Sequence, residues 1–386
     1  MSLSSGLRVA VFPPWSGHLG NRILTPGDHC TVADSFAAWR ARAADVGFQI
    51  DTHDICPPAQ ADILWFVDLP VRRRDFAAAV DAARPGTKLV LHQLESPLYA
   101  DAAHQPANQA LFDRVLTYNP KIAATSTRHR LCRIPYAFTR TSPGLPFAAR
   151  RIAVMVNTNK VVGWTERRGR GHGRTARPGI GRFLTGWKLP WQRWFNPCPG
   201  DLLPWRRRLA RAADRMSDPV LDVFGQNWRG ERIHWWRYPR PRPYRCALEA
   251  PGGDTLPDLS QGHAPKLGLL PRYRFTIASE NQFGDYGYIS EKLFDALQAG
   301  TVPLYLGDKH ITDLLPAEAF VDAREFRSPR RLLEHLARMP ESEWTRRRAA
   351  GQTWLQSPDA QSFGTEKFVE TAIQVLHELN PAHSLP

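Results

Sequence analysis

Cysteine is scarce in this sequence, and the few cysteines that occur are scattered. The chain has 386 residues and five cysteines, none of them in a Cys-x-x-Cys pair: Cys30, Cys56, Cys132, Cys198 and Cys246. An odd number of dispersed cysteines argues against a disulfide framework and against a typical zinc site. We therefore expect reduced thiols.

Long hydrophobic runs are also missing. The chain is 42% hydrophobic, yet no window approaches the roughly eighteen uninterrupted apolar residues that a membrane-spanning helix needs. The first residues, "MSLSSGLRVAVFPPWSGH", lack the basic start and the long apolar core of a secretory signal peptide. These two observations predict a globular protein in the cytoplasm.

Acidic residues are outnumbered by basic ones. The sequence has 37 Asp and Glu against 51 Lys and Arg, which gives a formal net charge of +14. Such an excess favours polyanionic partners: nucleic acid, an anionic membrane surface or a phosphorylated small molecule. The alternative, a solvated surface that happens to be rich in arginine, stays open for each single Arg.

Short apolar runs alternate with helical patterns, which is typical of parallel α/β layers. Strands are predicted at residues 7–12, 61–67, 88–93 and 113–118, then at 151–157, 220–225, 274–281, 301–308 and 319–323. Helices are predicted at residues 31–47, 72–83, 205–216, 289–299, 329–339 and 365–379. The Pro- and Gly-bearing stretch 139–150 interrupts the pattern and predicts a linker.

The fold class that follows is α/β, with two doubly wound, Rossmann-like halves facing a cleft. Ligands in such sheets bind at the carboxyl ends of the strands. We expect an N-terminal domain at residues 1–143 and a C-terminal domain at 144–362 with an insertion at about 161–200. Residues 363–386 would form a C-terminal helix that braces the two domains.

The insertion is rich in Gly, Arg and Trp and has no clear period. A connection of this length inside a compact domain is uncommon. Interleaved Arg and Trp could bind single-stranded nucleic acid, or could lie on an anionic membrane face. An inert insertion is the third interpretation, and the sequence slightly favours it.

The stretch 286–300, "YGYISEKLFDALQAG", carries the apolar stripe of a helix that ends at Gly300. Ser290 is the expected N-cap, so Glu291 and Lys292 lie in the first turn. A cation at the positive end of the helix dipole is unfavourable by about 0.3–1 kcal/mol unless an anion lies in front of it. A pyrophosphate would satisfy Lys292, and Gly284 and Gly287 would let the preceding loop approach such a ligand closely. The alternative is that Lys292 points to water and pairs with Asp295 or Gln298.

The stretch 273–308, "YRFTIASENQFGDYGYISEKLFDALQAGTVPLYLGD", resembles the donor-binding motif of the alpha-1,3-fucosyltransferases of glycosyltransferase family 10. In that motif a Phe-rich strand leads to Glu-Asn, a Tyr, a Thr-Glu-Lys triplet, a helix and Gly-x-Val-Pro-x-x-x-Gly. The sequence supplies Glu280-Asn281, Tyr288, Ser290-Glu291-Lys292 and "GTVPLYLG" at 300–307. Ser290 stands where the family has Thr.

Weaker similarities extend the resemblance to residues 88–323, apart from the insertion. "HQLESPLY", "FDRVLTYNP" and "IPYAF" resemble the family's Glu-Ser-Pro segment, the strand after it and its Pro-Tyr-Gly close. "DLLPWRRRLARAADRM" and "LDVFGQNW" resemble a helix whose first-turn Arg touches the donor phosphates, followed by an Asp-Val-Phe-Gly strand. The family implies a glycosyltransferase-B fold and an inverting transfer of L-fucose from GDP-fucose to a glycan hydroxyl.

The resemblance and the chemistry of that reaction together assign roles to particular residues. Glu95, which follows an apolar strand and precedes what we interpret as a helix-stopping Ser96-Pro97, is the expected catalytic base. Lys292 and Arg206 would neutralise the departing diphosphate. Arg207 and Arg208 adjoin Arg206, so the register of this contact stays open.

The remaining donor-binding candidates lie in the family 10 motif itself. Tyr288 would contact a phosphate or a ring, and Glu291 would accept hydrogen bonds from sugar or ribose hydroxyls. Asn281 and Glu280 are further donor-binding candidates, and for both an interpretation as residues that shape the loop is at least as good.

No cofactor is expected besides GDP-fucose as donor substrate. The sequence has no Asp-x-Asp element of the kind that holds a divalent metal in glycosyltransferases of the other main fold, although a stimulatory metal stays compatible. The expected acceptor is a glycan or lipid-linked glycan, with peripheral contact to the anionic inner face of a membrane. Two alternatives stay open: another nucleotide-sugar donor with the same fold and mechanism, and a nucleic-acid-binding protein that uses the Arg/Trp-rich segment.

Overall fold

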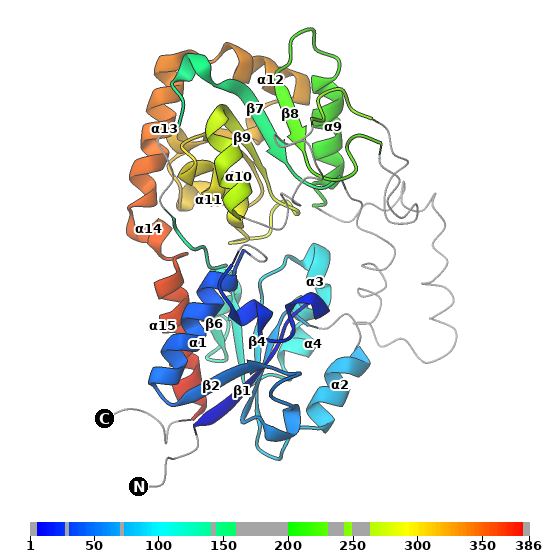
Figure 1. Cartoon of the computed structure of the whole chain (residues 1–386), viewed down its shortest axis with the longest axis vertical. Helices are drawn as coiled ribbons and strands as arrows, with labels where there is room; N and C mark the ends of the chain where they lie inside the picture. The colour runs from blue at the N-terminus through cyan, green and yellow to red at the C-terminus, as the bar shows by residue number, and fades with distance from the viewer. Residues whose placement is uncertain are drawn as a thin grey trace.

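The computed structural model describes residues 6–27, 31–69, 73–139, 144–159, 200–230, 243–248 and 263–380. The segment predicted to be an insertion at 161–200 lies outside these residues except for its last glycine. The two halves of the chain form the lower and upper lobes in Figure 1.

The first half is built on a six-stranded sheet in the order β2-β1-β3-β4-β5-β6, and every pair in it is parallel. Its strands are β1 (Leu7–Phe12), β2 (Phe48–Thr52), β3 (Ile63–Val67), β4 (Lys88–His92), β5 (Arg114–Thr117) and β6 (His129–Leu131). The helices of this half are α1 (Ala33–Asp45), α2 (Arg73–Asp81), α3 (Pro97–His104), α4 (Pro106–Gln109) and α5 (Pro120–Ala123). Because helices cover such sheets, their central strands are almost uniformly apolar.

The second half repeats this plan with a five-stranded parallel sheet in the order β11-β10-β9-β7-β8. Its strands are β7 (Arg151–Val156), β8 (Leu221–Phe224), β9 (Tyr273–Ser279), β10 (Val302–Leu306) and β11 (Val321–Asp322). Its helices are α9 (Leu203–Ala213), α10 (His263–Leu269), α11 (Glu291–Gln298), α12 (Pro329–Arg338) and α13 (Glu341–Leu355).

The end of the described chain returns to the first half. After α13, the short helix α14 (Pro358–Gln361) leads to α15 (Thr365–Leu379), which lies beside α1 in the lower lobe of Figure 1. Phe368 of α15 packs between Phe36 and Trp39 of α1 and the ring of His92. The helix predicted at 365–379 therefore belongs to the core of the N-terminal sheet.

Most of the predicted elements form, with ends shifted by a few residues. Each of the nine strands predicted from the apolar runs is present, and so are the predicted helices. The elements that were not predicted are the strands β2 and β6 and the helices α3, α4, α5, α10, α13 and α14. The interpretation of Ser96-Pro97 as a helix stop is wrong, because Ser96 is the N-cap and Pro97 the first residue of α3. Proline suits that position, since its missing N–H has no partner there in any helix.

Candidate active site

A cavity of about 580 Å³ lies where the carboxyl ends of the two sheets face each other. The first half contributes residues that follow β1, β3 and β4, with polar and aromatic side chains from Trp15, His18, Arg22, Asp68 and Glu95. The second half contributes residues that follow β7 and β9, the start of α11, and side chains from α9 and α10. Among these residues are Arg206, Lys266, Asn281, Tyr288, Glu291 and Lys292. This is the edge at which doubly wound sheets bind ligands.

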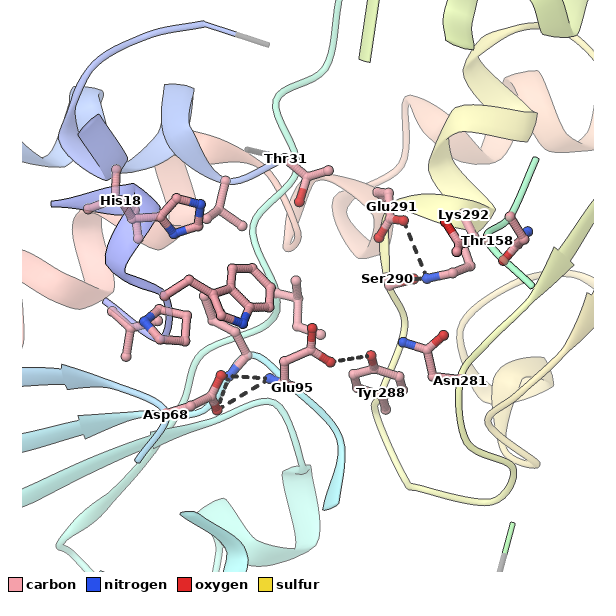
Figure 2. A pocket seen from close by; sticks show the side chains of 18 of the residues that line it. His18, Thr31, Asp68, Glu95, Thr158, Asn281, Tyr288, Ser290, Glu291 and Lys292 are labelled. Carbon is pink, nitrogen blue, oxygen red and sulfur yellow. Dashed lines mark hydrogen bonds and ion pairs between the residues drawn. The ribbon is translucent and has the colours of Figure 1, made fainter. Parts of the chain in front are cut away.

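Glu95 enters the cavity from the loop between β4 and α3. Its backbone N–H donates to the carboxylate of Asp68 at 3.2–3.3 Å, and its own carboxylate accepts the hydroxyl of Tyr288 at 3.3 Å. Figure 2 shows Glu95 between these two partners, one from each half of the molecule. The predicted base is therefore held in place from both sides of the cavity.

Asp68 is a cavity residue that the sequence analysis missed. It directly follows β3, adopts a left-handed backbone with φ 55°, and accepts the N–H groups of Leu94 and Glu95. Burial, and then the charge of Glu95, raises the pKa of Asp68 to about 8. A carboxylate at the end of a predicted parallel strand is the signal that could have identified it.

Lys292 lies in the first turn of α11, as predicted, but anions of the protein already surround it. Its ammonium lies 3.5 Å from a carboxylate oxygen of Glu280 and 3.3 Å from one of Glu291, and it donates to the hydroxyl of Ser290 at 2.8 Å. The suggested pairing with Asp295 or Gln298 is wrong. Asp295 forms its ion pair with a different lysine, and Gln298 donates to Thr139.

Glu280 binds Ser290, the residue that precedes α11. It is completely buried, and its carboxylate accepts the backbone N–H of Ser290 at 2.8 Å and the hydroxyl of Ser290 at 2.6 Å. Burial raises the pKa of Glu280, and the charge of Lys292 opposes that shift. Ser290 is the N-cap by position, but its side chain donates to Glu280 and does not cap the helix. Glu280 itself is not among the residues that line the cavity.

Among the three adjacent arginines of α9, Arg206 is the one that lines the cavity. Its side chain is buried and donates to the backbone carbonyls of Ser279 and Glu280 and to the side-chain oxygen of Asn281. Arg207 is half-buried and Arg208 exposed. Asn281 is thus tied to the arginine as well as lining the cavity, which fits its expected part in shaping the loop.

Lys266 is a second cavity residue that the sequence analysis missed. It comes from α10 and lies 2.5 Å from a carboxylate oxygen of Asp295 and 3.8 Å from one of Glu291. Burial opposes its charge, but the carboxylates of Asp295 and Glu291 more than compensate, so the pKa of Lys266 is raised. Residues 249–265 before it carry no interpretable pattern, so nothing in the sequence singled it out.

The resulting site is electrically asymmetric. The second half lines the cavity with Arg206, Lys266 and Lys292 against the single carboxylate of Glu291, whereas the first half supplies Glu95 and Asp68 with one cation, Arg22. Such an arrangement can hold an anionic group on one side while a carboxylate accepts a proton on the other. Of the predicted residues, all but Glu280 line this cavity.

Two features are absent from the described residues. No group of three or more His, Cys, Asp or Glu side chains in this part of the chain is placed to hold a metal ion. Within the same residues no helix is both long and apolar enough to cross a membrane.

Residues 253–349 match the family described as "Glycosyltransferase family 10 (fucosyltransferase) C-term". The chain is also similar to the alpha-(1,4)-fucosyltransferase of Arabidopsis thaliana, with 34% identity over 70 residues. That alignment covers 18% of this chain and 17% of the relative, so the sequence similarity spans a small part of both proteins. The predicted resemblance to family 10 is confirmed.

Solved structures extend the similarity to nearly the whole chain at the level of the fold. An alpha1,3-fucosyltransferase with GDP matches with a TM-score of 0.53 and 14% identity, over 98% of this chain and 92% of that one. The same enzyme type with GDP-fucose matches with a TM-score of 0.50 and 13% identity, over 97% and 92%. The predicted glycosyltransferase-B type of fold, with two parallel α/β halves, is confirmed.

Proposed function

Because residues 253–349 match the C-terminal domain of glycosyltransferase family 10, we propose that the chain transfers L-fucose from GDP-fucose to a glycan hydroxyl. The observation that carries the proposal is the asymmetric cavity, in which Glu95 of one half faces three cationic side chains of the other. A sugar nucleotide needs cations for its diphosphate, and its acceptor needs a base.

The reaction is an inverting substitution at the anomeric carbon of the donor sugar. The acceptor oxygen attacks from the face opposite the diphosphate, its bond to the carbon forms, and the bond between the carbon and the diphosphate oxygen breaks. Glu95 takes the acceptor proton, and the electron pair of the broken bond leaves with the diphosphate. Arg206, Lys266 and Lys292 would stabilise the negative charge that develops on the leaving group.

Calorimetric titration of the full chain with GDP and with UDP tests the donor side of this proposal. We expect GDP to bind and UDP to bind at least tenfold more weakly. A preference for UDP would favour the alternative of another nucleotide-sugar donor, and the absence of binding by either nucleotide would refute both. A panel of nucleotide sugars, scored by hydrolysis, then identifies the sugar.

The substitution Glu95→Gln tests the base. It keeps the shape of the side chain but removes its basicity, so transfer should fall by about 10²–10⁴-fold. GDP affinity should stay within about twofold, because Glu95 lies on the other side of the cavity. Glu318→Gln, at an exposed carboxylate of the second half, is the matched control. A Glu95→Gln enzyme with normal transfer would exclude Glu95 as the base.

The proposal includes a location, the cytoplasm at the inner face of a membrane, with a lipid-linked glycan as acceptor. It is supported by the formal net charge of +14, which favours anionic lipid surfaces. Sedimentation with phosphatidylglycerol vesicles checks this location. Binding should weaken at high salt, and a protein that stays in the supernatant at low salt would contradict it.

A further inference from the structure

Trp15 stands apart from the other exposed hydrophobic side chains. Among the described residues, those with large exposed hydrophobic side chains are Trp15, Ile55, Leu111, Leu131, Leu145 and Phe283. Only Trp15 lines the cavity, and with 59% of its surface accessible it is the most exposed of the group. Scattered exposed hydrophobics are ordinary, but a large aromatic on the wall of a cavity indicates a ligand contact.

The loop that carries Trp15 is firmly held. It follows β1, and Asn21 fastens it by donating to Asp51 at 2.7 Å and accepting the backbone N–H of Thr52 at 2.7 Å. Beyond Asn21, Ile23 and Leu24 are buried in the core of the first half. The indole is therefore displayed on a rigid support, and this saves the entropy that ordering a mobile loop would cost on binding.

Trp15 belongs to the acceptor side of the cavity. Its ring meets the ring of His18 in a T-shaped contact, with centroids 5.3 Å apart, which leaves most of the indole accessible. Figure 2 places His18 on the same side as Asp68 and Glu95, opposite Lys292 and Asn281. A group stacked on Trp15 would thus approach the proposed base from the side opposite Lys292.

We propose that Trp15 is the stacking platform for the acceptor sugar and that a pyranose ring lies on its indole with a hydroxyl directed to Glu95. An aromatic face favours the apolar C–H face of a sugar ring, and the rim hydroxyls stay free for polar contacts. This inference rests on the proposed function and specifies the chemical class of its acceptor site. The other planar group in the reaction, the guanine of the donor, is the competing occupant.

Saturation-transfer NMR with simple glycosides tests the platform. The probes are methyl β-D-galactopyranoside and methyl N-acetyl-β-D-glucosaminide, each with the full chain in the presence of GDP. For the wild type we expect saturation of at least one probe, strongest at the C–H protons of one ring face. Trp15→Ala should reduce that saturation at least fivefold, and Trp15→Phe should retain an intermediate signal.

Leu111→Ala is the matched control, because Leu111 is 50% exposed in the same half but does not line the cavity. It should leave the signal unchanged, and all variants should bind GDP within about twofold of the wild type. Equal saturation of wild type and Trp15→Ala, or none in the wild type, would overturn the platform. A selective loss of GDP affinity in Trp15→Ala would overturn it in favour of guanine. If the wild type itself fails to bind GDP, the proposed function fails, while the glycoside result still decides the platform.

Discussion

Two aspartates at opposite ends of β3 show how position decides what a carboxylate does. Asp62 precedes the strand, accepts the backbone N–H of Arg8 at 2.8 Å and keeps 30% of its side chain exposed. Asp68 follows the strand, is buried and accepts two N–H groups of the loop that carries Glu95. The two residues make the same kind of bond, but only Asp68 makes it at the cavity.

This comparison predicts that Asp68 positions Glu95, the proposed base. Asp68→Asn suits the left-handed backbone at this residue, since asparagine tolerates it well. Above pH 8, where the Asp68 carboxyl is ionised, the neutral amide bonds the two N–H groups more weakly than the carboxylate does. We expect kcat to fall by about 10–100-fold because Glu95 is less precisely held, with little change in the KM for GDP-fucose. Steady-state kinetics separate these two constants.

Asp62→Asn is the control for Asp68→Asn. It weakens a similar bond at the far edge of the sheet, so its kcat should match that of the wild type. If both variants lower kcat equally, or if the loss for Asp68→Asn simply follows a fall in melting temperature, the role of Asp68 is structural and no more.

At the scale of elements, local pattern predicted most of the fold. The strands that were predicted correctly are short apolar runs, and α11 was predicted from its apolar stripe. β2 was not predicted because its sequence, "FQIDT", contains polar residues whose partners are remote in sequence. The carboxylate of Asp51, for example, accepts hydrogen bonds from Arg40 and Asn21. α13 escaped because its sequence, "ESEWTRRRAAGQTWL", is dominated by charged and polar residues and buries few apolar ones.

The candidate site, like the fold, could be predicted where a residue's position follows from local sequence. The position of Lys292 in the first turn of α11 follows from local sequence. The contact between Glu280 and Lys292 does not follow from local sequence, because the intervening loop must fold back to bring the two residues together. Lys266 reaches the cavity from α10, and only the tertiary fold places it there.

The start of α11 leads to a prediction for Lys292→Ala. If the ammonium also contacts the diphosphate, its removal should weaken GDP binding by about 1.5–3 kcal/mol, the usual worth of a charged hydrogen bond. Lys309→Ala, at an exposed lysine of the same half, should have no effect. Calorimetry measures the affinity for GDP. The melting temperature reports how much stability is lost when the buried carboxylate of Glu280 has no lysine beside it. A lower melting temperature with unchanged GDP affinity would mean that Lys292 pairs with Glu280 and does not contact the diphosphate.

At the scale of the whole molecule, the two halves meet through the loop between β9 and α11. Gln282 accepts the N–H of Leu98, and Asp285 accepts the hydroxyl of Tyr118 at 2.5 Å. The hydroxyl of Tyr288 reaches Glu95 from the same loop. The loop that resembles the donor-binding motif therefore also takes part in the contact between the halves, so the proposed donor site and the position of Glu95 both depend on this segment.

Two glycines of this loop allow that dependence to be tested. Gly284 and Gly287 both have left-handed backbones, with φ of 77° and 80°, so alanine at either position is strained by roughly 1 kcal/mol. A methyl group at Gly284 would meet no atom within 4 Å, whereas one at Gly287 would lie 2.3 Å from the backbone oxygen of Tyr118 in the other half. Gly287→Ala must therefore displace the backbone at the contact between the halves, and Gly284→Ala need not.

We expect Gly284→Ala to lower the melting temperature slightly and to keep transfer within about threefold of the wild type, as local strain alone predicts. Gly287→Ala should lose transfer more than tenfold, because Tyr288 and the cations can no longer face Glu95 at the right separation. Small-angle scattering should show a larger radius of gyration for Gly287→Ala only. If the two variants behave alike in rate and in scattering, the contact between the halves does not control the reaction.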